Sequence, residues 1–187
     1  MHYKGKMLSW TPSVNQLGWQ IMESARLMKE NGWTLGIKNG KWLGGRLSEI
    51  DDKSFKGESS MEKTWVGLTK YALDAPETVM IHRGVDVPGK GNYRNILVHN
   101  LAQRAKSKAG CKMFYDPSHS LGPKLRDEIV EETLKAMQMK MKDGSYLYDG
   151  LLIEVGTSIT DTQQHITMKE FKELVDRLSE YRDFIVP

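Results

Sequence analysis

The sequence predicts an α/β protein built on a parallel sheet, and two observations carry this prediction. Short apolar runs of strand length alternate with longer segments whose apolar residues recur at helical spacing, and this strand-then-helix unit occurs five times in a row. The strands are mostly apolar, as is typical of a parallel sheet covered by helices. The chain has 187 residues, 39% hydrophobic and 27% charged, which excludes an intrinsically disordered chain. We therefore expect one domain over residues 1–187.

The five units follow one another without a linker or a low-complexity segment between them. Each strand is identified by its apolar run, and each helix by apolar residues three or four positions apart. The longest loop between them is polar and long enough to be functional. In chain order, the predicted strand and helix pairs are 7–10 with 17–29, 35–38 with 61–73, 79–82 with 97–106, 113–115 with 125–141, and 151–155 with 168–181.

Polar and charged side chains stand where four consecutive predicted strands end. Each of these side chains alone has an ordinary structural explanation. Their presence at the ends of four consecutive strands does not. Because the carboxyl ends of parallel strands lie at one edge of the sheet, where α/β proteins bind ligands, we expect a site there. The residues are Lys38, Asn39, His82, Arg83, Asp116, Ser118, His119 and Glu154.

Two cations at neighbouring strand ends, Lys38 and Arg83, suggest an anion clamp. Each is close to a glycine that lets a ligand approach the backbone, and Arg83 could hold a phosphate or carboxylate with two hydrogen bonds. The alternative is an ordinary ion pair with a carboxylate. Lys124 and Arg126 open the next helix, where they could contact a phosphate or simply lie in solvent.

One imidazole and two carboxylates follow the last two predicted strands. His119, Glu154 and Asp161 form a mixed nitrogen and oxygen set that suits a divalent metal such as Mn²⁺, Fe²⁺ or Zn²⁺. The alternative is that Asp161 caps a turn and that Glu154 pairs with a lysine. The single cysteine, Cys111, excludes a disulfide framework and a zinc site made of cysteines, and we expect it to be a small buried residue.

Charge and hydropathy restrict the class of partner. The 27 basic and 24 acidic residues are interleaved and give a net charge of +3, which favours a small anionic ligand over nucleic acid. The longest apolar runs are of strand length, far below the roughly 18 residues that a membrane span needs. We therefore expect no membrane segment and no targeting segment, and a cytoplasmic protein.

The residues at the strand ends resemble a known barrel family. The segments Ile-His-Arg-Gly (81–84), Asp-Pro-Ser-His (116–119), Ile-Glu-Val (153–155) and Ser-Ile-Thr-Asp (158–161), the last with Gln163 and Gln164, are similar to the phosphoenolpyruvate-dependent aldolases. The segment Gly-Ile-Lys-Asn-Gly (36–40) is similar to the lysine strand of that family. Asp-Pro-Ser-His favours the branch of 3-deoxy-D-arabino-heptulosonate 7-phosphate (DAHP) synthases over that of the 3-deoxy-octulosonate 8-phosphate synthases.

This resemblance implies a fold, a reaction and a set of site residues. The fold would be a partial (β/α)₈ barrel, about five parallel βα units corresponding to strands 4–8. Phosphoenolpyruvate would condense with a phosphorylated aldose such as erythrose 4-phosphate, with one divalent metal (Mn²⁺, Fe²⁺, Co²⁺ or Zn²⁺) polarising the aldehyde. His119, Glu154 and Asp161 would hold the metal, and Lys38, Arg83 and His119 would be catalytic. Substrate would contact Lys38, Asn39, Arg83, Asp116, Ser118 and Lys124.

The sequence also departs from this family. No residue matches the cysteine that serves the family as a fourth metal ligand, and Lys124 stands where the family has an arginine. A complete barrel takes roughly 250 residues, and nothing here matches its first three units. We therefore expect a homo-oligomer or a partner chain that supplies the missing units. The alternative is a non-catalytic half-barrel that binds a phosphorylated ligand or a partner as a regulatory or scaffold module.

Overall fold

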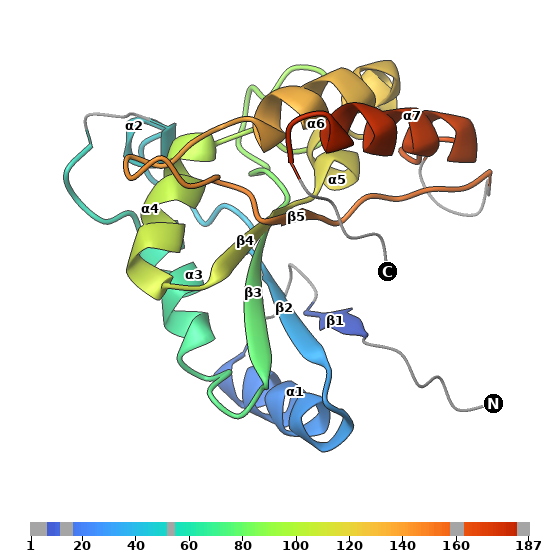
Figure 1. Cartoon of the computed structure of the whole chain (residues 1–187). Coiled ribbons are helices and arrows are strands. Elements are labelled where there is room, and N and C mark those ends of the chain that lie inside the picture. The colour runs from blue at the N-terminus through green and yellow to red at the C-terminus, as the bar shows by residue number, and fades with distance from the viewer. Residues whose placement is uncertain (1–6, 12–16, 52–54, 158–162, 183–187) are drawn as a thin grey trace. The chain divides into compact units, whose positions relative to one another are not determined.

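The fold is described from a computed structural model over residues 7–11, 17–51, 55–157 and 163–182 (Figure 1). Five strands follow one another in the sheet in the order in which they occur in the chain. The pairs β1–β2, β2–β3 and β4–β5 are parallel, which confirms the predicted class of a partial α/β barrel with about five βα units. The strands are β1 (Leu8–Trp10), β2 (Thr34–Lys38), β3 (Glu77–His82), β4 (Lys112–Tyr115) and β5 (Gly150–Leu151).

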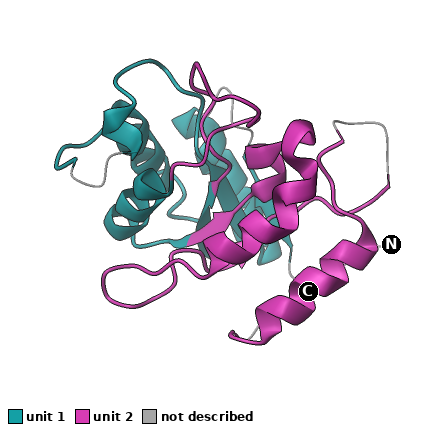
Figure 2. Ribbon diagram, turned by 90° about the horizontal axis from the view of Figure 1, so that it is seen from above, with its two compact units in different colours: residues 1–81, 99–112 teal, residues 82–98, 113–187 magenta. Residues whose placement is uncertain are grey.

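The chain divides into two compact units, which Figure 2 distinguishes by colour. Unit 1 comprises residues 1–81 and 99–112, and unit 2 comprises residues 82–98 and 113–187. The side chains predicted to form one site are divided between them, because Lys38 and Asn39 belong to unit 1 and the remaining predicted residues belong to unit 2.

Unit 1 holds β1, β2, most of β3 and four helices. The buried face of the first helix consists of Ile21, Ala25 and Met28, which recur at the predicted helical spacing. This helix ends at Gly32, whose φ of 67° is the left-handed conformation that closes a helix. The helices are α1 (Gly18–Asn31), α2 (Ser48–Asp51), α3 (Ser60–Thr69) and α4 (His99–Ala109).

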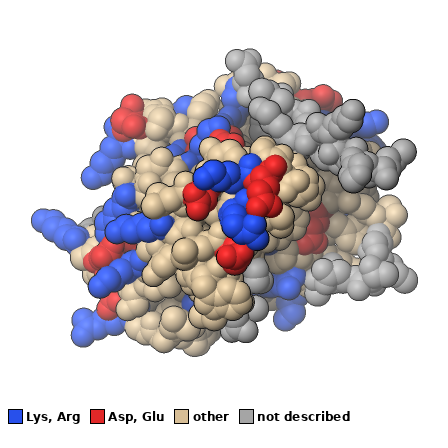
Figure 3. Space-filling model, turned by 90° about the horizontal axis from the view of Figure 1, so that it is seen from below, with Lys and Arg blue, Asp and Glu red and all other residues tan. Residues whose placement is uncertain are grey.

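A buried carboxylate joins α3 to α4 in unit 1. Glu62 is completely buried, and its two oxygens lie 2.8 Å from Arg104 Nε and 2.6 Å from Lys108 Nζ. A carboxylate in this position is tolerated because both of its oxygens have cationic partners. On the face of the molecule shown in Figure 3, acidic and basic side chains likewise lie among one another, as their interleaving in the sequence suggests.

Unit 2 holds most of β4, β5 and the helices that follow them, and these helices contact one another in succession. The predicted helix over 125–141 is wrong in its extent. Pro123 opens a short 3-10 helix, Leu125 within it departs from helical geometry with φ −119°, and the regular helix begins only at Ile129. The elements are α5 (Pro117–Leu121), η1 (Pro123–Glu128), α6 (Ile129–Met137) and α7 (Met168–Ser179).

The predicted strand over 151–155 is also shorter than expected. β4 ends at Tyr115, and the chain then turns into α5, so β4 offers no partner to residues beyond Leu152. The main chain of Glu154 bonds elsewhere: its carbonyl accepts from the Ile166 backbone at 2.9 Å, and its N–H donates to the Ser118 hydroxyl at 3.0 Å. Within the described ranges, no helix is both long enough and apolar enough to cross a membrane.

Candidate functional site

Asp116 positions His119 at the end of β4. Asp116 is the N-cap of α5, and its carboxylate accepts a hydrogen bond from the His119 backbone N–H at 3.1 Å. The same carboxylate lies 3.0 Å from the imidazole Nδ1. Since an ionised carboxylate can only accept, Nδ1 is the donor in this pair. Metal-binding histidines usually have such a carboxylate partner.

Glu154 faces this histidine from the segment after β5. Its Oε1 lies 3.5 Å from His119 Nδ1 and accepts a hydrogen bond from Gln164 Nε2 at 2.9 Å. Ser118 is completely buried, and its hydroxyl accepts from the Glu154 backbone. The structure therefore brings His119, Glu154, Asp116 and Ser118 together in unit 2.

The donor types in this cluster suit a divalent metal. An imidazole nitrogen and a carboxylate oxygen are ligands that Mn²⁺, Fe²⁺, Co²⁺ and Zn²⁺ all accept. Asp161, the third predicted ligand, lies outside the described residues. Among the residues that are described, no three His, Cys, Asp or Glu side chains are arranged to hold an ion together. Of the three predicted ligands, the described cluster contains His119 and Glu154. It also contains Asp116, which orients His119.

Arg83 follows β3 and is buried in unit 2. Burial lowers the pKa of its guanidinium from 12.5, and the nearby carboxylates of Asp86 and Asp116 oppose this shift, so the group stays cationic at neutral pH. The strand end itself holds the cluster, because the carbonyl of His82 accepts a hydrogen bond from the Asp116 backbone at 2.9 Å. A buried cation therefore stands close to the carboxylate that orients His119.

The His82 side chain packs into the core of unit 2. Its ring is fully buried, its Nδ1 lies 2.7 Å from the Tyr148 hydroxyl, and the two rings are parallel to within 2°. Burial raises the pKa of Tyr148 well above its ordinary value, so this tyrosine stays protonated. His82 was expected among the side chains of a ligand site at the strand ends, whereas the structure supports a packing role.

Lys38 and Asn39 end β2 in unit 1. Both are buried, and Lys38 Nζ lies 5.6 Å from the centre of the Trp10 ring, within the range of a cation–π contact. The Asn39 backbone N–H donates to the carbonyl of Ile81 at 3.0 Å, which fixes the turn after the strand. Trp10 was not predicted as part of the site, although an aromatic residue at the end of the neighbouring strand is the signal that could have indicated it.

Three residues that the sequence did not assign to the site support it from nearby. Arg94 donates to the Oε1 of Gln164, and Gln164 in turn donates to Glu154. Asn95 donates its side-chain N–H to the carbonyl of His119 at 2.6 Å. Hydrogen bonds between distant loops leave no periodic signal, so these contacts could not be predicted from the sequence.

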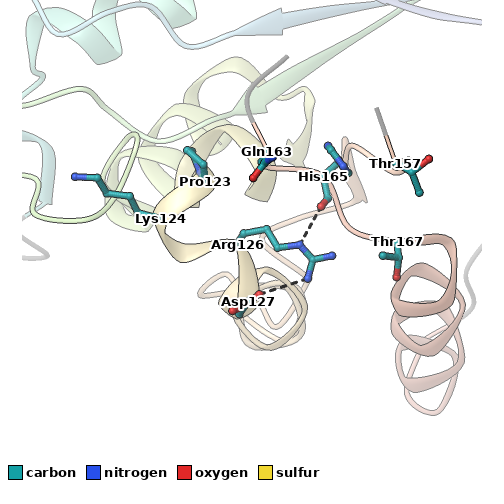
Figure 4. A pocket seen from close by; sticks show the side chains of 9 residues that line it. Pro123, Lys124, Arg126, Asp127, Thr157, Gln163, His165 and Thr167 are labelled. Atoms are coloured by element: carbon teal, nitrogen blue, oxygen red, sulfur yellow. Dashed lines mark hydrogen bonds and ion pairs between the residues drawn. The ribbon is translucent and has the colours of Figure 1, made fainter. Parts of the chain in front are cut away.

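A cavity of about 390 Å³ lies in unit 2 between η1 and the start of α7. Figure 4 shows that the Arg126 guanidinium and the Lys124 side chain extend in different directions. Arg126 donates its Nε–H to the carbonyl of His165 at 3.1 Å and pairs through both terminal nitrogens with Glu170. Lys124 is exposed at the rim. The lining residues are Pro123, Lys124, Arg126, Asp127, Gly156, Thr157, Gln163, His165 and Thr167.

No protein-family model matches the chain, and no curated protein sequence matches it. Solved structures do. A phospho-2-dehydro-3-deoxyheptonate aldolase (DAHP synthase) from Thermotoga maritima aligns with a TM-score of 0.66 and 17% identity over 92% of this chain and 44% of its own. A truncated 3-deoxy-D-arabino-heptulosonate 7-phosphate synthase from Thermotoga maritima aligns with a TM-score of 0.61 and 18% identity, over 92% and 56%.

The chain therefore has part of a DAHP-synthase-like fold, and it spans about half the length of these two structures. At this level of identity the likeness concerns the fold alone. It agrees with the family resemblance of the strand-end residues. Any activity must be argued from the site.

Proposed function

We propose that this chain belongs to a metal-dependent aldolase that condenses phosphoenolpyruvate with a phosphorylated aldose such as erythrose 4-phosphate. The observation that carries the proposal is the imidazole of His119, which Asp116 holds through Nδ1 and which faces Glu154 at 3.5 Å. The cluster stands after neighbouring strands of a fold shared with DAHP synthases, where parallel α/β proteins bind their ligands.

In this proposal His119, the Glu154 carboxylate and Asp161 hold one divalent ion, of Mn²⁺, Fe²⁺, Co²⁺ or Zn²⁺. When bound, such an ion supplies Lewis-acid polarisation of the aldehyde. Asp116 orients the His119 ring, and the buried Ser118 hydroxyl fixes the main chain at Glu154.

The substrate would be held by cations. The Arg83 guanidinium, buried and permanently charged, fits the carboxylate or phosphate of phosphoenolpyruvate with two hydrogen bonds. Lys38 and Asn39, at the end of β2 in unit 1, are proposed as further substrate contacts, and Lys124 as a contact for a phosphate. With reactants held in this way, the C3 carbon of phosphoenolpyruvate bonds to the aldehyde carbon, water adds at C2, and inorganic phosphate leaves.

We also propose that the functional protein is an assembly, either a homo-oligomer or a complex with a chain that supplies further barrel units. The chain spans 44% and 56% of the two solved structures, and β1 stands at one end of the strand order. Trp10 of this strand is 49% exposed, and edge strands of this kind are ready to pair with another chain.

The metal site is tested by Mn²⁺ binding to the purified full chain, followed through the electron paramagnetic resonance signal of free Mn²⁺. We expect one equivalent to bind, and His119→Ala and Glu154→Ala each to weaken binding strongly. His165→Ala is the matched control, because the imidazole of His165 lies outside the cluster. Equal Mn²⁺ affinity in the wild type and both cluster variants would refute the metal site.

The reaction is tested by phosphate release from phosphoenolpyruvate in the presence of erythrose 4-phosphate. We expect release to require the metal and to disappear in Arg83→Ala. A second candidate is a non-catalytic module that binds a phosphorylated ligand, and it is favoured by the half-length match to the solved structures. Binding of phosphoenolpyruvate that depends on Arg83, without any phosphate release, would support the second candidate over the first.

A further inference from the structure

The loop before α4 is fixed to the end of α5 through its main chain. The backbone N–H groups of Arg94 and Asn95 donate to the carbonyls of Leu121 and Ser120 at 3.1 and 2.9 Å. The two segments approach so closely that a Cβ on Gly122 would lie 2.5 Å from the Cβ of Arg94, and Gly122 also has a φ of +72°. Only glycine fits there, so the sequence is adapted to this contact.

From this fixed position, the Asn95 side chain reaches the candidate ligand on α5. Asn95 is buried, and its Nδ2–H donates to the carbonyl of His119 at 2.6 Å. This bond holds the main chain of the residue whose imidazole Asp116 orients. His119 is therefore fixed from two sides, at its carbonyl and at its ring.

Arg94 reaches the other candidate ligand through Gln164. A guanidinium can only donate, so the oxygen of the buried Gln164 amide must face Arg94 and its nitrogen must face away. That nitrogen donates to Glu154 Oε1 at 2.9 Å. With the opposite amide orientation, the Gln164 oxygen would face the Glu154 carboxylate and its N–H groups would face a cation. Arg94 thus determines that the side-chain N–H of Gln164, and not its oxygen, faces the Glu154 carboxylate.

We propose that Arg94 and Asn95 form one positioning element, which sets the candidate ligands Glu154 and His119 relative to each other, with Gln164 transmitting the effect of Arg94. In this role Arg94 and Asn95 act through the ligands. The proposal rests on the proposed function for its use in metal binding, whereas the orientation of Glu154 can be tested without metal.

The metal-free test is the side-chain amide signal of Gln164 in nitrogen-15 nuclear magnetic resonance. We expect its protons to exchange slowly with water in the wild type, because the amide is buried and paired at both ends. Arg94→Met and Glu154→Ala should each shift this signal and speed its exchange, while Gln163→Ala should leave it unchanged. A Gln164 signal that is the same in the wild type, Arg94→Met and Glu154→Ala would overturn the proposal.

The second test is the Kd for Mn²⁺. Loss of such a supporting contact typically weakens metal binding by about 10- to 100-fold, so we expect this for Gln164→Ala, with Gln163→Ala within about twofold of the wild type. Because Arg94 acts through Gln164, the double variant Arg94→Met/Gln164→Ala should bind no more weakly than Gln164→Ala alone. Asn95→Asp acts on the other ligand, so its effect should multiply with that of Gln164→Ala.

The Mn²⁺ test distinguishes a failure of the positioning role of Arg94 and Asn95 from a failure of the proposed metal function. Multiplying effects of Arg94→Met and Gln164→Ala, or wild-type affinity in Gln164→Ala, would overturn the positioning role. If the wild type binds no Mn²⁺ but the Gln164 signal responds as expected, the metal function fails and the orientation of Glu154 by Arg94 stands. Thermal unfolding of every variant confirms that the affinities compare folded proteins.

Discussion

Replacing Arg126 by methionine should destabilise the protein at neutral pH and have far less effect near pH 3. Arg126 stands in η1 and pairs through two nitrogens with the carboxylate of Glu170 in the first turn of α7. The same carboxylate accepts from the backbone N–H and the hydroxyl of Thr167, at 2.7 Å each, in a capping box. One side chain thus ties the start of α7 to the segment before α6.

The magnitude follows from the pKa of Glu170, which is lowered from 4.5 to about 2, chiefly by the hydrogen bond with Arg126 and further by the Thr167 cap. At 1.36 kcal/mol per pH unit, a shift of about 2.5 units sets a ceiling of about 3.4 kcal/mol. The Glu170 side chain is 30% exposed, and solvent and salt screen the pair, so we expect a coupling energy of about 1–2 kcal/mol.

The sign of the pH dependence follows from the same shift. Because the pKa of Glu170 is lower in the folded state, its contribution is complete above pH 4.5 and is lost as the pH falls toward 2. Linkage with these two values gives a loss of more than half of the contribution, roughly 2 kcal/mol of the ceiling, already at pH 3.

The assay is a double-mutant cycle in urea unfolding, with Arg126→Met, Glu170→Gln and both together, at pH 7 and pH 3. The more exposed pair of Arg177 and Glu131, which links α7 to α6, is the matched control and should give a smaller coupling energy. A coupling energy for Arg126 and Glu170 that is close to zero at pH 7, or equal at the two pH values, would refute the reasoning.

Three further predictions concern Glu62, Gly84 and Cys111, of which Cys111 is only half-buried, whereas the sequence predicted a buried residue. Glu62→Ala leaves the partly buried Arg104 without its carboxylate and should cost about 3–5 kcal/mol in urea unfolding; a cost below about 1 kcal/mol would contradict this. Gly84→Ala should cost more than about 1 kcal/mol, because Gly84 has a φ of +78° and a Cβ there would lie 2.4 Å from the Asn95 carbonyl oxygen; an unchanged urea midpoint would argue against it. Burial raises the pKa of the Cys111 thiol, so alkylation by iodoacetamide at pH 7 should be slower than for an unfolded peptide thiol, and an equal or faster rate would be inconsistent with the structure.

Periodicity was sufficient to predict most of the fold. The apolar residues of β2, β3 and β4 and the stripe of α1 are buried in the sheet and helix that their spacing indicates. The two errors in extent have local causes that periodicity does not register. Pro123 and the irregular Leu125 delay the helix after His119, and the early end of β4 leaves residues beyond Leu152 without a partner in β4.

The candidate site was predictable in its residue types and not in its contacts. Asp116, His119 and Glu154 could be selected because they stand where strands end, and the structure brings them together. That the hydroxyl of Ser118 would accept from the Glu154 backbone depends on the local path of the chain. The role of Gln164 depends on contacts between loops far apart in the sequence.

The structure also separates two cations that the sequence treats alike. Lys124 and Arg126 both open the segment after α5 and were both candidates for a phosphate contact. The guanidinium of Arg126 is occupied by Glu170 and the carbonyl of His165, so an anion could bind it only by displacing a carboxylate that also caps α7. Lys124 is exposed at the cavity rim, and among the described contacts its side chain has no comparable hydrogen bond or ion pair. A phosphate that binds this segment should therefore depend on the charge of Lys124, while loss of Arg126 should first affect stability.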